Sequence, residues 1–302
     1  MKTVFMGTPD FAVKPLEAIA NRHDVVCVVT RTDKSRGRGN KVTPSPVKQA
    51  AQALGLNVFQ PETLRDADAV NFLRSLDADI FIVAAFGMLL PADVLDIPRY
   101  GCVNIHASLL PKYRGAAPIN RAIMNGDEYG GVSIMYMAQG LDTGDVILQK
   151  RFPISGLTAG EYHDLLSSAG SDAILEAMAQ IENGTAQRIP QDDAFATYAS
   201  KITKEELWLD FDLDSTSVCN KIKGLSPAPG ARFTLDGRVI KALDAHPSHG
   251  QGAAGELLKV SKEGIEMACR EGSVTINLLV PEGSSKMTGE AFYAGYNGVK
   301  RT

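Results

Sequence analysis

Apolar and polar positions along the first 190 residues fall into two alternating patterns. Lys2–Met6 and Val25–Thr30 are short β-branched apolar runs that predict buried strands, and the amphipathic stretch Phe11–Ala20 between them predicts a helix. The alternation continues through Ser45–Leu54, Val58–Pro61, Asp66–Leu76, Asp79–Phe86 and Gly101–His106. Strands that alternate with helices of about 10–15 residues are typical of βαβ units. We therefore predict an α/β fold with a doubly wound, mostly parallel sheet, in which ligands bind beyond the carboxyl ends of the strands.

Start signals mark two of these helices, and a longer helix follows. Gly7–Asp10 predicts a tight turn with Asp10 as the N-cap, and Ser45 precedes a proline suited to the first helical position. Thr158–Ile181 predicts a long helix that an Asn-Gly pair ends. Its apolar stripe consists of Leu165, Leu166, Ala169, Ile174, Leu175 and Met178.

The pattern changes in the last third of the chain. The segment 186–198 is polar, lacks periodicity and contains Pro190, so we expect a linker over residues 189–204. From about Lys204, short apolar runs separated by Gly, Pro and Asp predict a small β-barrel or sandwich, and we expect an OB-like barrel. The predicted strands are Gly230–Leu235, Val239–Leu243, Gly255–Val260, Gly264–Ala268 and Ser273–Leu279. We accordingly expect one domain at residues 1–188 and a second at 205–302.

The composition of the 302 residues excludes several classes of protein. An apolar fraction of 44% and a charged fraction of 22% exclude disordered, collagen-like and coiled-coil chains. The longest mostly apolar run, Ile80–Pro91, is shorter than the about 20 residues that cross a membrane, and the chain starts without the features of a signal peptide. The four cysteines lie far apart without a CxxC pair. We therefore expect a cytoplasmic protein without a zinc site, a structural disulfide or a membrane partner.

Two polar residues end one of the predicted strands. Asn104 and His106 are two positions apart, so both side chains point to the same face at the strand's carboxyl end. There they can present an amide donor and an imidazole to one small volume. The alternative from the residues alone is that Asn104 caps a turn and His106 is a hydrogen-bonded surface histidine.

A second candidate lies in a glycine-rich loop between two strand-like runs. Asp142 stands in Gly140-Leu-Asp-Thr-Gly144. An aspartate in such a loop often bonds its own backbone as a turn residue. As a functional group, its carboxylate could orient the ring of His106 and raise its basicity. Neither a metal-ligand spacing nor a serine-hydrolase elbow accompanies these residues.

A basic loop follows the second predicted strand. Arg31–Lys48 contains six basic residues and one acidic residue, in a chain whose net charge is −4. A flexible loop of this composition is either solvated or binds a polyanion, because clustered Lys and Arg side chains neutralise phosphates. Arg36, Arg38 and Lys41 are the candidates for contact with such a polyanion.

The segment Asn104-Ile-His-Ala-Ser-Leu-Leu-Pro-Lys-Tyr-Arg-Gly115 resembles the folate-dependent formyltransferases. In that family an Asn and a His two apart, followed by Ser-Leu-Leu-Pro, join a distant Asp in a glycine loop, and Asp142 fits that position. Further stretches are similar to the branch of the family that formylates methionyl-tRNA. They are Gly7–Phe11, Gly37–Lys48, Ala85–Pro91, Arg114–Ile119 and Lys201–Glu206. The departures are few: Ala228 stands where many members have Trp, and Tyr113 and Phe86 replace other aromatic residues.

The resemblance implies a formyltransferase-like variant of the Rossmann fold and a specific reaction. N10-formyltetrahydrofolate would be the formyl donor, and the α-amine of methionyl initiator tRNA would attack it directly, without a metal or a covalent intermediate. Asn104 would donate to the oxyanion, His106 would donate to it or protonate N10, and Asp142 would hold the imidazole and help to remove the amine proton. We expect the enzyme to act as a monomer.

The resemblance also implies the folate contacts. The turn Ser108–Pro111 and the backbone after the strand at Asp79–Phe86 would frame the pterin. The residues concerned are Ser108, Leu109, Leu110, Pro111, Phe86, Gly87, Met88 and Leu90.

Two other functions remain open. One is formylation of a nucleotide-linked amino sugar, by an enzyme of the same family that also carries a small β domain. The other is a non-catalytic RNA-binding protein, a function that the OB-like second domain would support if it were considered alone. The basic loop favours RNA over a sugar nucleotide, as does Ser215–Lys262, which has seven basic and three acidic residues. The Asn–His–Asp set argues against a protein without catalysis.

Overall fold

The computed structural model describes residues 1–36, 41–298 and 300. The chain forms two compact units, and each consists of three stretches. The first contains residues 1–115, 131–152 and 163–198, and the second contains 116–130, 153–162 and 199–302. The domains predicted from the sequence, with boundaries at residues 188 and 205, are each one continuous stretch, whereas each observed unit combines three stretches. The division into a catalytic and a second functional domain stays a prediction.

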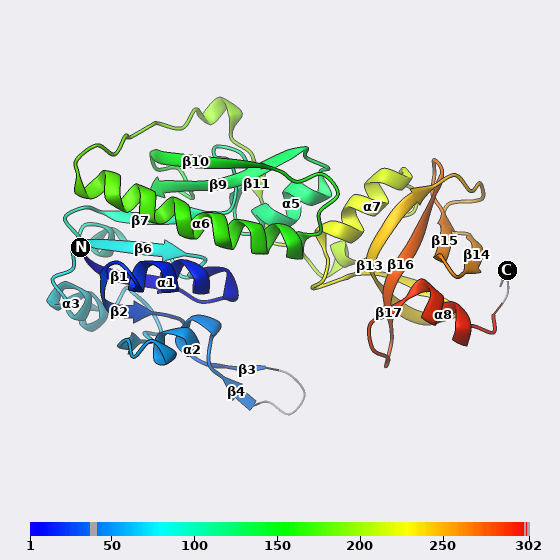
Figure 1. The fold of residues 1–302 in the computed structure, drawn as a ribbon, viewed down its shortest axis with the longest axis horizontal. Helices are drawn as coiled ribbons and strands as arrows, with labels where there is room; N and C mark the ends of the chain where they lie inside the picture. The colour runs from blue at the N-terminus through cyan, green and yellow to red at the C-terminus, as the bar shows by residue number, and fades with distance from the viewer. Residues whose placement is uncertain (37–40, 299, 301–302) are drawn as a thin grey trace. The chain divides into compact units, whose positions relative to one another are not determined.

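A seven-stranded sheet forms the centre of the first unit, in the order β10-β9-β7-β6-β1-β2-β5 (Figure 1). Its strands are β1 (Lys2–Gly7), β2 (Asp24–Val29), β5 (Val58–Phe59), β6 (Ile80–Ala84), β7 (Cys102–His106), β9 (Tyr129–Tyr136) and β10 (Val146–Pro153). β1 pairs in parallel with β2 and β6, β2 pairs in parallel with β5, and β6 pairs in parallel with β7. β7 and β9 pair in the antiparallel direction. The predicted mostly parallel sheet is confirmed.

Helices cover both faces of this sheet. They are η1 (Asp10–Ala12), α1 (Val13–Ala20), α2 (Pro46–Ala53), α3 (Ala67–Ser75), α4 (Ala92–Leu95) and α6 (Ala159–Glu182). On one face, Leu73 of α3 and Val94 of α4 share a buried core with Val4 of β1. On the other, α6 approaches β7 closely, because a Cβ at Gly170 would lie 2.9 Å from the side chain of Ile105. Two covered faces explain the apolar runs of the central strands.

The helix starts follow the sequence signals in one case and depart from them in another. Ser45 caps α2, since its Oγ accepts a hydrogen bond from the Lys48 N–H, and Pro46 occupies the first position as predicted. The prediction of Asp10 as an N-cap is wrong. Pro9 precedes a single 3-10 turn that contains Asp10, and the Asp10 carboxylate accepts only from the neighbouring N–H of Phe11.

The second unit contains an antiparallel sheet in the order β12-β13-β16-β15-β14, with β17 beside β16. Its strands are β12 (Ala231–Leu235), β13 (Arg238–Ser248), β14 (Leu257–Ser261), β15 (Gly264–Ala268), β16 (Ser273–Pro281) and β17 (Met287–Thr288). The helices of this unit are α5 (Pro118–Met124), η3 (Glu205–Leu207), α7 (Ser215–Gly224) and α8 (Gly289–Gly295). The prediction of a smaller domain built from short strands is confirmed. The sequence reasoning missed α7, which Asp214 caps by accepting the Ser217 N–H.

Five short elements remain among the described residues. They are the paired strands β3 (Lys34–Arg36) and β4 (Lys41–Thr43), then β8 (Arg114–Gly115), β11 (Tyr198–Ala199) and the 3-10 turn η2 (Asp193–Phe195). Over the residues that the structure describes, no helix combines the length and apolar character needed to cross a membrane.

Candidate active site

The carboxyl end of β7 carries the polar pair that the sequence indicates. Asn104 and His106 share a strand face with Cys102, whose thiol lies 3.9 Å from the carbonyl oxygen of Val94 in α4. His106 is buried, with 5% of its surface exposed, whereas Asn104 is half-buried. No hydrogen bond engages the side-chain amide of Asn104 among the described residues. Its N–H groups are therefore available to an oxygen atom of a ligand.

Both ring nitrogens of His106 face an oxygen atom. Nε2 lies 3.0 Å from the carbonyl oxygen of Tyr113, and Nδ1 lies 3.7 Å from Oδ2 of Asp142. A carbonyl oxygen only accepts, so the bond to Tyr113 places a proton on Nε2. Nδ1 of the neutral ring is then a proton acceptor directed toward the carboxylate. When Nδ1 takes a proton, the imidazolium and Asp142 form a charge pair.

The loop between β9 and β10 brings Asp142 to this ring in a left-handed backbone conformation, with φ of 52°. Asp is among the few residue types other than Gly that adopt this conformation with some frequency. The backbone N–H of Gly115 donates to Oδ2 of Asp142 at 2.8 Å. Gly144 has to lack a side chain, because a Cβ there would lie 1.8 Å from the carbonyl oxygen of Tyr136. The glycine loop therefore positions the carboxylate beside His106, although its catalytic role stays a prediction.

Behind this loop lies a buried cation that the sequence reasoning did not single out as a site residue. Arg114 is 2% exposed, and its guanidinium donates to Oε1 of Gln191 through Nε at 3.0 Å and through Nη2 at 2.9 Å. Nη2 also donates to the carboxylate of Asp193 at 2.8 Å. Arg114 follows the Ser-Leu-Leu-Pro motif and could have been found there. Gln191 carries no signal, since it lies in the polar segment predicted as a linker.

A network of hydrogen bonds holds the turn that contains the predicted folate residues Ser108 to Pro111. Ser108 is buried, and its Oγ donates to the carbonyl oxygen of Lys112 at 2.6 Å. Ser133 of β9 donates to the carbonyl oxygen of Ser108 at 2.6 Å and accepts the N–H of Leu110 at 3.0 Å. Leu110 and Pro111 line a cavity of about 250 Å³ together with Val146, Leu148, Gln149 and residues 189–192. Leu109 packs against Gly131 of β9.

The other predicted folate residues follow β6. The side chains of Phe86 and Leu90 are buried in the core below the sheet, whereas Gly87 is exposed and Met88 is half-buried. Thr8 donates through Oγ1 to the carbonyl oxygen of Phe86 at 2.8 Å. The side chains of Phe86 and Leu90 thus support this segment from within, and Gly87, Met88 and Leu89 form its outer surface.

The basic loop is described only in part. Arg36 and Lys41 are a backbone pair at the ends of β3 and β4, but their side chains are not described, and Arg38 lies outside the described residues. Lys48 forms an ion pair with Asp33 at 2.6 Å. Within residues 1–36, 41–298 and 300, no group of three or more His, Cys, Asp or Glu side chains forms a candidate metal site.

Comparison with known proteins assigns the family. Residues 1–178 match the formyl transferase family, and residues 201–297 match the formyl transferase C-terminal domain. The methionyl-tRNA formyltransferase of Macrococcus caseolyticus is 46% identical over 97% of this chain and 95% of its own length. That of Neisseria meningitidis serogroup C is 44% identical over 98% and 97%, respectively. The chain therefore belongs to the formyltransferase family, within its methionyl-tRNA formyltransferase branch, and is a formyl-transferring enzyme.

A solved structure supports the fold. The N-formyltransferase from Helicobacter canadensis, in complex with folinic acid and dTDP-3-aminofucose, aligns with a TM-score of 0.67 over 95% of this chain and all of the other. The two sequences are 19% identical, so this similarity concerns the fold alone. The resemblance that the motifs indicate is confirmed at the level of the family.

Proposed function

We propose that this enzyme transfers the formyl group of N10-formyltetrahydrofolate to the α-amine of methionyl initiator tRNA. The observation that carries this assignment is the similarity to methionyl-tRNA formyltransferases over nearly the full length of both chains. The juxtaposition of His106 and Asp142 at 3.7 Å supports a reaction with proton transfer at the end of β7.

The side chains suit a direct attack. The amine nitrogen bonds to the formyl carbon and gives a tetrahedral intermediate with an oxyanion, and the bond from that carbon to N10 then breaks. The unengaged amide of Asn104 donates to the oxyanion, an interaction whose loss often costs about 3 kcal/mol. Nδ1 of His106 takes the proton that the attacking amine loses, and Asp142 stabilises the resulting imidazolium. The protonated ring then supplies the proton that N10 needs as the leaving group.

The solved N-formyltransferase from Helicobacter canadensis is in complex with folinic acid, which supports a folate as the formyl donor of this enzyme. We assign the pterin to the space between the turn Ser108–Pro111 and the backbone of Phe86–Leu90. Gly87, Met88 and Leu89 form the accessible part of the second segment, because Phe86 and Leu90 are buried in the core. Leu109, Leu110 and Pro111 supply apolar contacts on the other side.

We assign the RNA to residues of both sequence-predicted domains. Arg36, Arg38 and Lys41 contact the phosphates of the acceptor end beside the folate, in the catalytic domain at residues 1–188. The domain at residues 205–302, with seven basic residues in Ser215–Lys262, contacts the tRNA body. The enzyme acts as a monomer in the cytoplasm.

A comparison of acceptors tests the assignment against its alternative. Purified enzyme with N10-formyltetrahydrofolate should formylate methionyl initiator tRNA and leave a dTDP- or UDP-linked amino sugar unchanged. Formylation of the sugar at a higher kcat/KM would reverse the assignment. Binding of tRNA without formylation of either acceptor would leave only the non-catalytic RNA-binding function.

A further inference from the structure

The segment after α6, predicted as a linker, folds back on the first unit. Figure 1 shows the chain turning at the end of α6 and running back across β10 and β9. Ile189 and Val146 exchange backbone hydrogen bonds at 2.9 and 3.0 Å. Farther along, Thr197 accepts the Arg114 N–H through its carbonyl oxygen and the Tyr113 N–H through Oγ1, each at 2.8 Å. One end of the segment is thus held by Val146 of β10, and the other end is held by Tyr113 and Arg114.

Gln191 lies between these two attachments, and both the nitrogen and the oxygen of its side-chain amide form hydrogen bonds. Its Nε2 donates to the backbone carbonyl oxygens of Asp142 and Gly144, both at 2.8 Å. Its Oε1 accepts two hydrogen bonds from Arg114. Rotating the amide by 180° would set its oxygen against two carbonyls and its N–H groups against a guanidinium. The orientation of the amide is therefore determined by its partners.

The buried guanidinium of Arg114 strengthens this arrangement. A charged donor on Oε1 polarises the amide, and its N–H groups then donate more strongly to the loop. Asp193 shares the guanidinium, but its own side chain is 83% exposed. Gln191 is consequently the residue that joins the buried cation to the loop of Asp142.

We propose that Gln191 is a positioning residue that holds the backbone of the Asp142 loop so that the carboxylate stays at the His106 ring. The loop requires such support because Asp142 adopts a left-handed backbone conformation that most residue types disfavour. The N–H of Gly115 holds the carboxylate, and Gln191 holds the carbonyl groups of Asp142 and Gly144. This role rests on the proposed function, in which Asp142 acts through His106.

Replacement of Gln191 by Glu separates the interaction with Arg114 from the interaction with the loop carbonyls. In Gln191→Glu, the new carboxylate keeps the bond to Arg114 as an ion pair, so folding should persist. The donation to Asp142 and Gly144 is lost, and the carboxylate repels both carbonyl oxygens. Asp193→Asn is the matched control, because it weakens the other partner of Arg114 and leaves both loop bonds intact.

The kinetic test measures single-turnover formyl transfer for both variants and for Gln191→Glu combined with Asp142→Asn. Gln191→Glu should lower the rate by roughly 10-fold to 100-fold with each KM within about twofold, since a displacement of about 1 Å can cost that much. In the Asp142→Asn background it should cost less than about twofold, because both changes act through one carboxylate. Asp193→Asn should stay within about threefold of wild type. A wild-type rate for Gln191→Glu, or multiplying effects in the double variant, would overturn the proposal.

A measurement without substrate separates this proposal from the proposed function. Hydrogen exchange of the peptide spanning residues 137–146 should be several-fold faster in Gln191→Glu than in wild type or Asp193→Asn. Unchanged exchange would overturn the positioning role, whatever the acceptor is. Faster exchange in a protein that does not formylate methionyl-tRNA would place the failure in the proposed function alone.

Discussion

Replacing Asp142 by Asn removes one charge from the proposed site and keeps the shape of the loop. The new amide oxygen still accepts the N–H of Gly115, and Asn adopts the left-handed conformation at least as readily as Asp. What disappears is the attraction between the carboxylate and the imidazolium of His106. Any loss of rate in a variant that melts normally therefore reports this attraction.

The distance between the two charges gives the size of the expected loss of rate. Two unit charges 3.7 Å apart interact with about 4.5 kcal/mol at an effective dielectric constant of 20, and with about 1 kcal/mol in bulk water. The His106 and Asp142 side chains are 6% and 17% exposed, so the larger value applies more closely. Since about 1.4 kcal/mol corresponds to a factor of ten, Asp142→Asn should lower the rate of formyl transfer by roughly 10²- to 10³-fold.

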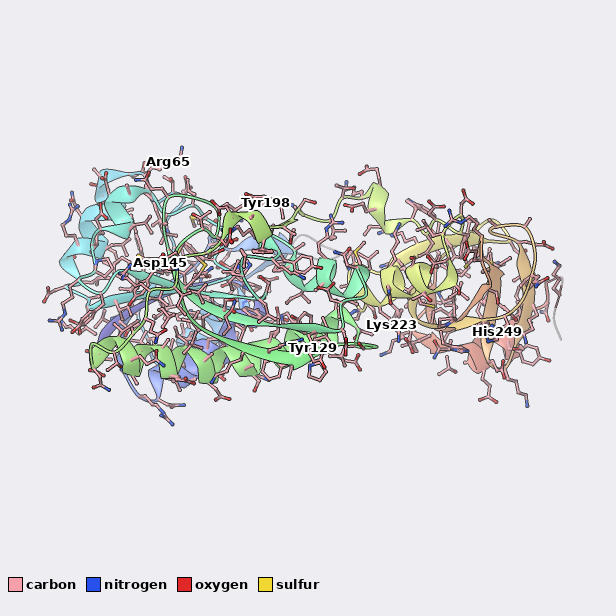
Figure 2. The ribbon with its side chains drawn as sticks, turned by 90° about the horizontal axis from the view of Figure 1, so that it is seen from above. Arg65, Tyr129, Asp145, Tyr198, Lys223 and His249 are labelled. Atoms are coloured by element: carbon pink, nitrogen blue, oxygen red, sulfur yellow. The ribbon has the colours of Figure 1, made fainter. Side chains whose placement is uncertain are left out.

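Asp145 provides a control at the same separation. Figure 2 labels Asp145, which lies directly before β10. Its carboxylate lies 3.7 Å from the Arg188 guanidinium, but the Asp145 and Arg188 side chains are 35% and 60% exposed. Solvent screens such a pair, so Asp145→Asn should change the rate by less than about threefold. Rapid-quench single turnover with saturating folate and methionyl-tRNA measures both variants. A rate above about a third of wild type for Asp142→Asn, or equal losses in the two variants, would refute the reasoning.

Three further measurements address other parts of the chain. Simultaneous replacement of the proposed tRNA contacts should raise the KM for tRNA and flatten its salt dependence with little change for the folate, and identical salt slopes would contradict phosphate contact. The residues replaced by Ala are Arg36, Arg38 and Lys41. Hydrogen bonds from Arg121 lower the pKa of Glu206 to about 2 from its usual 4.5, so the stabilisation is present above pH 4.5 and lost as the pH falls toward 2. Glu206→Gln should cost about 1 kcal/mol at pH 7 in denaturant unfolding and progressively less in acid, and a constant difference would contradict this. Burial raises the pKa of the four thiols to about 11 or 12, so native protein at pH 8 should react with iodoacetamide far more slowly than unfolded protein. The thiols are Cys27, Cys102, Cys219 and Cys269.

Much of the fold follows from local pattern, and so does half of the candidate site. The strand at Cys102–His106 is one residue shorter than the predicted run, and alternation along it placed Asn104 and His106 on one face. Asp142 is different, because an aspartate between glycines has a common role as a turn residue. The residues alone left both roles open, and the family resemblance favoured its pairing with His106. The helix α7 was overlooked because its apolar stripe is short and because it lies next to a region in which the pattern predicts short strands.

The sequence by itself determined most of the strands and helices of the first 190 residues, the side of its strand that each residue occupies, and the family to which the chain belongs. Those properties depend on residues a few positions apart, through side-chain period and backbone preference. The tertiary structure decided the strand order, the burial of Arg114 and the contact of Gln191 with Asp142, 49 residues away. Such contacts depend on the path of the chain between them, because a polar segment without periodicity can extend away from a sheet or fold back on it. The buried cation and the two carbonyl oxygens that Gln191 joins come together only when the sheet and the segment after α6 are in place.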